Sequence, residues 1–117
     1  MKIENIKFKA KKTLDGKWIK GDLVHHKDSD NVWITDYENQ LTSPVDPLTV
    51  CMFTGLKDKN GTPIYEGDMV THKDNNAERR GTINWDSKTA AFCFGCYFLY
   101  NFPSENMVVA GNKFNSR

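Results

Sequence analysis

The sequence predicts a small, mostly β protein that folds as an SH3-like barrel or a sandwich, with an N-terminal β-hairpin and a possible short C-terminal helix. Short runs of apolar, β-branched and aromatic residues recur along the 117 residues, which is typical of strands. Turn dipeptides such as Asp15-Gly16 and Asn60-Gly61 separate these runs, and no segment keeps a helical period over several turns. Many short strands at close spacing indicate a barrel or a sandwich.

The first half of the chain predicts strands at residues 6–12, 17–26, 32–35 and 50–53. Apolar residues alternate with lysines in the first of these segments, which is the pattern of a half-buried strand. The dipeptide Asp15-Gly16 makes the first two segments a predicted antiparallel hairpin. Residues 37–49 are expected to be irregular, because Pro44 and Pro47 exclude a regular helix.

The central stretch, residues 54–70 with the sequence TGLKDKNGTPIYEGDMV, is the richest in turn-forming residues. Asn60-Gly61 suits a primed hairpin turn or a closely related one, because Asn tolerates positive φ and Gly adopts it freely. Pro63 is expected at a sheet edge or at the first residue of a strand, since it has no N–H. Residues 66–68 predict a second turn. A calcium loop does not fit, because its first and closing positions carry no carboxylate, so we predict a structural role.

The second half predicts further strands after a charged loop at residues 72–80. Residues 81–85 and 90–94 are a hairpin candidate, and residues 107–110 are a last strand. Residues 96–102 either extend the second of these strands or begin a short helix, and periodicity does not distinguish the two.

Composition indicates one globular domain in a reducing compartment. Hydrophobic residues make up 38% of the chain, and 117 residues can bury a modest core but not two independent ones. We expect a single domain over residues 1–117, with N-terminal strands in residues 1–53 and the turn-rich core and C-terminal strands in residues 54–117. The net charge of +1 does not demand a nucleic acid or a membrane surface as partner. No apolar run approaches the roughly 20 residues of a membrane span, and the odd number of cysteines, 3, predicts a cytoplasmic protein without a disulfide framework.

Two runs in the middle of the chain follow one another closely: residues 54–61, TGLKDKNG, and residues 64–68, IYEGD. Together they resemble the most characteristic run of the YopX family of small phage and prophage proteins. Further segments similar to that family are residues 6–10, Trp18 with Gly21 and residues 23–24, residues 45–47 with 49–50, and residues 109–114. The resemblance is lost between residues 75 and 101. It implies a single YopX-like domain that is encoded by a phage or an integrated element, acts in the cytoplasm of the bacterial host and carries over no catalytic residues.

Cys93 and Cys96 have the C-x-x-C spacing of a metal or redox motif. A zinc site needs about four ligands, and this pair supplies two of them. The remaining candidate ligands, which lack a matching partner at ligand spacing, are Cys51, His25, His26 and His72. A redox pair is favoured by a helix N-terminus, whereas the surroundings here are strand-like and aromatic. We expect core or incidental thiols, surface histidines, no metal and no cofactor, with a metal-dependent enzyme or a redox pair as minor alternatives.

A row of basic residues is the main electrostatic feature of the sequence. The candidate nucleic-acid-binding residues are Lys7, Lys9, Lys11, Lys12, Arg79 and Arg80. The first three share one face of the first predicted strand, and the two arginines extend the row if their loop folds nearby. The alternative is a solvated edge strand, because edge strands use lysine to discourage pairing. Aromatic residues do not interleave with these lysines in the sequence, which weakens the nucleic-acid interpretation.

An aromatic cluster near the C-terminus exceeds what one face of a thin domain can bury. Its members are Phe92, Phe94, Tyr97, Phe98, Tyr100 and Phe102. A purely core cluster is the expected assignment, and a subunit contact by some of its members is the alternative. No nucleophile motif or glycine-rich nucleotide loop is present, so we predict that the protein is not an enzyme. The leading prediction is a non-enzymatic phage accessory protein that forms homo-oligomers and binds a host or phage macromolecule. The alternative is a regulatory nucleic-acid-binding protein that uses the basic strand face.

Overall fold

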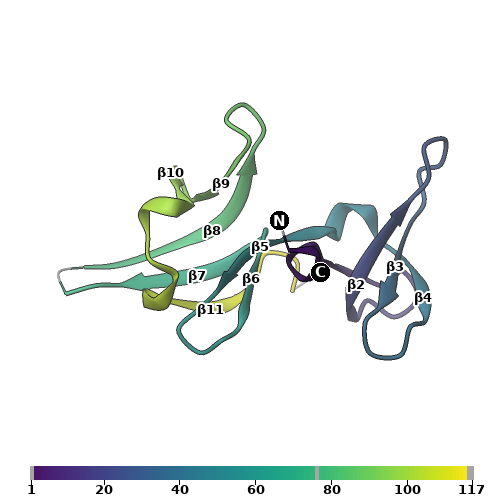
Figure 1. Ribbon diagram of the computed structural model, residues 1–117, viewed down its shortest axis with the longest axis horizontal. Coiled ribbons are helices and arrows are strands. Elements are labelled where there is room, and N and C mark those ends of the chain that lie inside the picture. The colour runs from purple at the N-terminus through teal and green to yellow at the C-terminus, as the bar shows by residue number, and fades with distance from the viewer. Residues whose placement is uncertain (1, 76, 116–117) are drawn as a thin grey trace. The chain divides into compact units, whose positions relative to one another are not determined.

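The structure is a computed structural model that describes residues 2–75 and 77–115 (Figure 1). The ends of the predicted domain, residues 1 and 117, lie outside the described residues. Antiparallel strands dominate the described chain, so the mostly β class predicted from the sequence is confirmed. The chain divides into two compact units, Met1–Phe53 and Thr54–Arg117.

The first unit is built around an antiparallel sheet. Its strands are β1 (Phe8–Lys11), β2 (Trp18–His25), β3 (Val32–Asp36) and β4 (Thr42–Val45), in the order β4-β3-β2-β1. The first residues of β5 (Cys51–Lys57) pair with the other side of β1. Short 3-10 turns lie at η1 (Ile3–Asn5) and η2 (Pro47–Thr49). The predicted hairpin of β1 and β2 is confirmed, because Ala10 pairs with Ile19 and Lys11 pairs with Trp18.

The prediction that residues 37–49 are irregular is wrong, because residues 42–45 form strand β4. Pro44 lies within this strand and pairs with Trp33 of β3. The Pro44 carbonyl accepts a hydrogen bond from the Thr13 N–H at 3.1 Å and therefore points away from β3. Because the N–H and C=O of a strand residue point to the same side, the missing N–H of this proline removes no bond of the β3–β4 ladder. The register between β3 and β4 decides whether the Pro44 nitrogen faces β3 or points away from it. The local sequence does not reveal this register.

The core of the first unit lies on one face of its sheet. The buried members are Ala10, Ile19, Val32, Ile34 and Val45. A bridge between Lys12 and Val45, with the Asp46 N–H donating to the Lys11 carbonyl at 2.9 Å, joins the end of β1 to β4. Because β2 and β3 separate β1 from β4 in the ladder, this contact curls the sheet around its apolar face.

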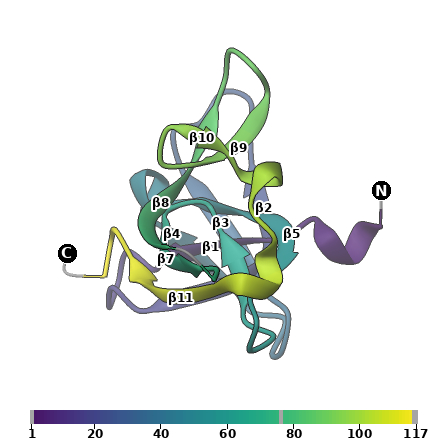
Figure 2. The ribbon, with the colours of Figure 1, turned by 90° about the vertical axis from the view of Figure 1, so that its left-hand side faces the viewer.

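The second unit contains a five-stranded antiparallel sheet. Its strands are β7 (Asp68–Lys73), β8 (Glu78–Asp86), β9 (Ala91–Phe94), β10 (Tyr97–Phe98) and β11 (Met107–Asn112), in the order β10-β9-β8-β7-β11. Strand β6 (Pro63–Tyr65) lies outside this sheet as the neighbour of β5. The 3-10 turns η3 (Leu99–Asn101) and η4 (Ser104–Asn106) precede β11, which returns to pair with β7 (Figure 2).

Most predicted elements of the second unit are confirmed, and one is wrong. Pro63 is the first residue of β6, and β8 and β9 form the predicted hairpin. The predicted loop at residues 72–80 is instead mostly strand, because β7 and β8 pair up to Lys73 and Glu78. Residues 96–102 do not extend β9, because β10 turns back and pairs antiparallel with it. The short helix of the second alternative is the 3-10 turn η3. The helical segments of the described chain are three-residue 3-10 turns, and none of them is long and apolar enough to cross a membrane.

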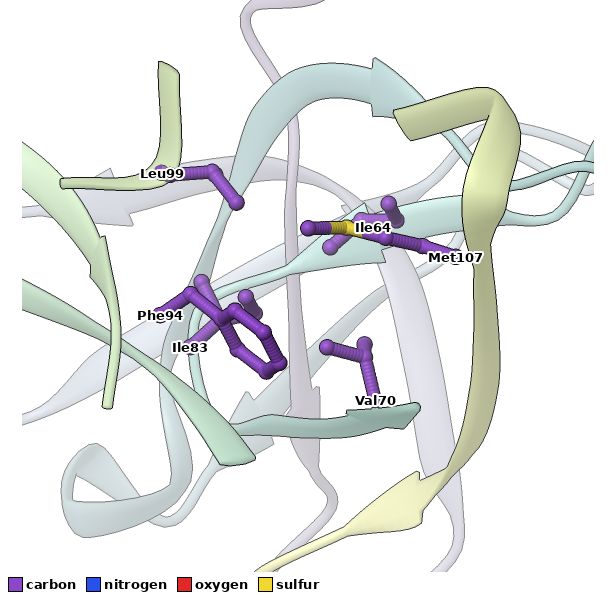
Figure 3. Packing of buried hydrophobic residues seen from close by; sticks show 6 residues of the cluster. All are labelled: Ile64, Val70, Ile83, Phe94, Leu99 and Met107. Atoms are coloured by element: carbon purple, nitrogen blue, oxygen red, sulfur yellow. The ribbon is translucent and has the colours of Figure 1, made fainter. Parts of the chain in front are cut away.

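A separate apolar core fills the second unit. Its buried members are Ile64, Val70, Ile83, Phe94, Leu99 and Met107, whose side chains point toward one another (Figure 3). Chain length predicted one modest core, whereas the described residues hold two buried clusters, one in each unit. Within residues 2–75 and 77–115 the strands form open sheets. The barrel named in the predicted fold is not formed, because β10 and β11, the end strands of the second sheet, do not pair with each other.

Candidate functional site

Asp58 organises the first turn of the central stretch. Its side chain is 6% exposed, and its Oδ1 accepts hydrogen bonds from the N–H groups of Asn60 and Thr62 at 2.8 and 2.9 Å. The Gly61 N–H donates to the Asp58 carbonyl at 3.0 Å, and Gly61 has a φ of 81°. Positive φ falls on Gly61 and not on Asn60, so the turn is the related form that ends in a left-handed glycine, not a primed turn.

The Asp58 carboxylate also reaches strand β11. Asp58 Oδ2 accepts the Val109 N–H at 2.9 Å, and the neighbouring Lys59 N–H donates to the Met107 carbonyl at 3.0 Å. Burial acts to raise the pKa of Asp58, but hydrogen bonds from three backbone N–H groups stabilise its charged form, and the pKa is lowered overall. These bonds join backbone segments of the fold, so Asp58 has a structural role.

Asp68 holds the second turn in the same way. Its side chain is 1% exposed, its Oδ2 accepts the Tyr65 N–H at 2.8 Å, and its Oδ1 accepts the side-chain amide of Asn112 at 3.0 Å. The Gly67 N–H donates to the Ile83 carbonyl at 2.7 Å. The two predicted turns of the central stretch are therefore confirmed. Sequence reasoning missed the β11 partners of both aspartates, because they lie 51 and 44 residues further along the chain.

The lysines of β1 and the residue before it lie over aromatic rings. Lys7 Nζ is 4.4 Å from the centroid of the Phe53 ring, and the Nζ atoms of Lys9 and Lys11 are 5.0 and 5.7 Å from the Trp18 ring. Cation–π attraction holds these ammonium groups against the sheet, and Lys11 is only 7% exposed. Aromatic residues do not interleave with these lysines in the sequence, but the register of β1 and β2 places Trp18 opposite Lys11.

Strand β1 is not an edge strand. It pairs with β2 on one side and with β5 on the other, so the interpretation of its lysines as edge protection is wrong. Lys9 lies directly opposite Lys20 of β2, so the two side chains are neighbours on one face of the sheet. Sequence reasoning did not include Lys20, since only the register of the two strands brings it beside Lys9.

The other basic candidates have contacts of their own. Lys12 Nζ lies 3.4 Å from Asp15 Oδ2 in the turn between β1 and β2. Arg79 and Arg80 belong to strand β8 of the second unit and not to a loop. The Arg79 guanidinium lies 5.7 Å from the centroid of the Phe102 ring. Nucleic-acid binding by the six candidates stays a prediction.

The aromatic cluster is only partly core. Phe94 is buried, whereas Tyr97 and Tyr100 are 59% and 77% exposed, so the expected core-only assignment is wrong. Trp85, which sequence reasoning did not include, packs edge-on against Phe92 with ring centroids 5.0 Å apart. We call the exposed and half-buried members the aromatic surface: Trp85, Phe92, Tyr97, Phe98, Tyr100 and Phe102.

An apolar hollow of about 450 Å³ lies within the aromatic surface. It is lined by residues of β5, β9, η3 and the segment after η3: Thr54, Leu56, Ala91, Phe92, Leu99, Tyr100, Phe102, Pro103 and Ser104. Leu99 also belongs to the buried core, so the hollow adjoins that core. The Thr54 hydroxyl donates to the Ile64 carbonyl at 2.7 Å and is engaged within the fold. The hollow therefore suits an apolar side chain of a partner.

His72 is buried among aromatic rings of the second unit. It is 3% exposed, and its ring centroid lies 5.2 Å from that of Phe102 and 6.4 Å from that of Phe94. Among the described residues, neither of its ring nitrogens has a hydrogen-bond partner. The predicted surface position is wrong, because alternation along β7 places His72 on the same inward face as Val70.

The cysteines and the remaining histidines are dispersed. Cys93 is buried on β9, Cys51 is buried on β5, and Cys96 is exposed in the turn that leads to β10. His25 and His26 are exposed, as predicted. In residues 2–75 and 77–115, no three His, Cys, Asp or Glu side chains come close enough together to hold a metal ion.

The comparison with known families gives one match that spans nearly the whole chain. The family described as YopX protein matches residues 7–116, a span that includes both turns and the Asp58, Asp68 and Asn112 side chains. No match was found among curated proteins. The matched span runs from the residue before β1 to beyond the end of β11. The chain therefore belongs to the YopX family.

Proposed function

We propose that this protein is a non-enzymatic binding module of a phage or prophage that acts in the cytoplasm of the bacterial host. It forms homo-oligomers and binds a host or phage macromolecule through the aromatic surface of its second unit. The observation that carries this function is Tyr100, a large side chain that is 77% exposed beside an apolar hollow of about 450 Å³.

Exposed aromatic rings beside a hollow favour a protein as the partner. Tyr and Trp offer a large apolar area with a polar end, and both are enriched in protein interfaces. Phe98 and Tyr100 stack with ring centroids 5.5 Å apart and planes 13° apart, which holds both rings in a defined orientation. Rings that are ordered before binding lose little conformational entropy on association. Binding energy is commonly concentrated on a few such residues.

The placement of the buried carboxylates supports a non-enzymatic role. Asp58 accepts backbone N–H groups, and Asp68 accepts the Tyr65 N–H and the Asn112 amide. A general acid or base must instead present its carboxyl to a substrate. The hollow in the aromatic surface has mostly apolar walls, which suits binding better than proton transfer.

The strand order of the second unit supports an open, SH3-like arrangement as part of the same proposal. Strands β7, β8 and β9 form a meander, 3-10 turns follow, and β11 returns to pair with β7. An experimental structure of residues 54–117 in the full chain would test this comparison.

Size-exclusion chromatography with light scattering tests self-association. We expect a mass above that of one chain that rises with concentration, and Tyr100→Ser should weaken the association by about tenfold or more, as for a central interface aromatic. Leu14→Ser is the matched control, because Leu14 is a fully exposed apolar residue of the first unit, and this change should leave the mass unaltered. If the protein stays strictly monomeric at high concentration, self-association is excluded.

A second candidate function is nucleic-acid binding by the basic face of the first unit. The observation in its favour is the register of β1 and β2, which sets Lys9 directly opposite Lys20 on the face that also carries Lys11. Lysines grouped on one face of a sheet can contact successive phosphates of a nucleic acid, and each such contact adds to the affinity and to its salt dependence.

Fluorescence anisotropy with labelled single-stranded DNA and RNA tests this second candidate. We expect the affinity to fall as salt rises, and Lys9→Gln and Lys20→Gln to lower both the affinity and the salt dependence. Lys88→Gln, in the exposed turn between β8 and β9, is the control with the same change of charge. Absence of binding at low salt excludes this function.

A further inference from the structure

Strand β11 is the last strand in the order of the second unit's sheet. The turn at residues 58–62, which we call the Asp58 turn, forms hydrogen bonds with the side of β11 that faces away from β7. In an antiparallel pair, the N–H and C=O groups of alternate residues point away from the partner strand. The Met107 carbonyl accepts the Lys59 N–H at 3.0 Å, and the Val109 N–H donates to Asp58 Oδ2 at 2.9 Å. The groups of Val108, between them, face β7.

Asp58 and Lys59 thus supply the acceptor and the donor that the backbone of a neighbouring strand would supply. The carboxylate is held in position by its own turn, since Oδ1 accepts the N–H groups of Asn60 and Thr62. The turn also occupies the space beside β11 that another strand would need. Exposed sheet edges otherwise act as templates for pairing with a second chain.

The regular part of β11 is short, and the turn lies at its middle. A bulge between Val109 and Gly111 interrupts the register with β7. Beyond the bulge, the Lys113 N–H donates to the Gly67 carbonyl at 3.0 Å, which ties the end of the strand to the second turn. An added strand would therefore have to pair at residues 107–109, where the Asp58 turn lies.

We propose that the turn at residues 58–62 is an autoinhibitory edge cap that prevents β11 from pairing with β11 of a second copy of this chain. Residues 107–112, MVVAGN, carry no charged side chain and no proline. Two antiparallel copies of this strand would therefore meet without charge repulsion, and each residue would have a backbone N–H that can donate a hydrogen bond. The cap, and not the composition of β11, keeps this edge closed. Association through the aromatic surface is a different contact, so the edge cap does not depend on it.

Analytical ultracentrifugation of Asp58→Ala and Lys59→Pro tests the cap against the wild type. Asp58→Ala removes the acceptor of the Val109 N–H. Lys59→Pro removes the donor to the Met107 carbonyl, while proline fits the second position of a type I turn. Each variant removes one of the two hydrogen bonds that hold the turn against β11, so the turn can leave the edge and the freed backbone groups can bond in a dimer. We expect each variant, shown to be folded by circular dichroism, to self-associate at least about tenfold more tightly than the wild type.

Adding Val109→Pro to Asp58→Ala distinguishes edge pairing from other association, because proline removes the freed N–H from the edge. This double variant should return to the mass of the wild type. Association that persists in the double variant, or a folded single variant with the wild-type mass, would overturn the cap. If Asp58→Ala does not fold, Lys59→Pro and its combination with Val109→Pro decide the question. Repeating the series with Tyr100→Ser separates edge pairing from association through the aromatic surface.

Discussion

The side-chain amide of Asn112 donates a hydrogen bond to Asp68 Oδ1 at 3.0 Å, although the two residues lie 44 positions apart in the chain. Asp68 is the first residue of β7 and Asn112 is the last residue of β11, and the two are opposite one another in the register of these strands. Both side chains are buried, so water does not compete for the bond. This contact and the hydrogen bond from the Lys113 N–H to the Gly67 carbonyl join the second turn of the central stretch to β11.

Loss of the Asp68 carboxylate should strongly destabilise the second unit. We expect Asp68→Ala to lower the free energy of unfolding by about 2–5 kcal/mol, because it removes the acceptor of the Tyr65 N–H and of the Asn112 amide. A double-mutant cycle with Asn112→Ala, measured by urea denaturation, should give a coupling energy of about 1–3 kcal/mol. Additive losses would show that the two side chains act independently.

Gly21 and Gly61 both lie in segments that are similar to the YopX family. Replacing each of them by alanine should change the stability of the protein by different amounts. A Cβ at Gly21 of β2 would collide with the backbone carbonyl of Thr35 on β3, and neither backbone can move without breaking the ladder. A Cβ at Gly61 meets open space, so only the positive φ is unfavourable, by about 1–2 kcal/mol. We expect Gly21→Ala to cost about 3 kcal/mol or more, as measured by thermal unfolding. Equal losses for both variants would contradict this difference.

His72 should be a site where an apolar substitution stabilises the protein. Both of its ring nitrogens are buried without a hydrogen-bond partner among the described residues, and such groups cost about 1–3 kcal/mol each. We expect His72→Leu to raise the free energy of unfolding by about 1 kcal/mol or more. His25→Leu, at an exposed position, is the control and should change it by less than about 0.5 kcal/mol. A clear destabilisation by His72→Leu would show that the imidazole makes favourable polar contacts.

The charged form of Asp58 should stabilise the fold in a defined range of pH. Since folding lowers the pKa of Asp58, its contribution is complete above the pKa of an unfolded aspartate, about 3.9, and is lost as pH falls through the lower pKa of the folded state. Urea midpoints measured from neutral to strongly acidic pH should therefore fall more steeply in the wild type than in Asp58→Asn. Asp15→Asn is the control, because Asp15, whose pKa the Lys17 N–H chiefly lowers, lies in an exposed turn and should contribute little. Parallel curves for wild type and Asp58→Asn would contradict this role.

Local patterns predicted the elements whose side chains alternate or whose turns carry Gly and Asp. The hairpin of β1 and β2, the strand at Pro63 and the final strand belong to this group. The errors arose where pairing between distant segments decides the structure. Pro44 lies in a strand because its nitrogen faces away from β3, and β1 is interior because β5 pairs with it at Cys51 and Met52.

The candidate surfaces were predicted only in part, for the same reason. The aromatic cluster was visible in the sequence, but its division between the buried Phe94 and the exposed Tyr100 depends on which face of each element meets the core. The contact of Lys11 with Trp18 depends on strand register. The inward position of His72 follows from alternation along β7, a strand that extends through residues expected to form a loop.

Concentration-dependent 1H–15N NMR spectra test most directly whether the aromatic surface is the contact between copies. On dilution of the wild type we predict shifts at Phe92 and at residues 97–102, with little change at residues 7–20 or at residues 58–59 and 107–109. Tyr100→Ser should abolish these shifts over the same range of concentration. Shifts centred on residues 7–20, or spectra that do not change with concentration, would contradict the account.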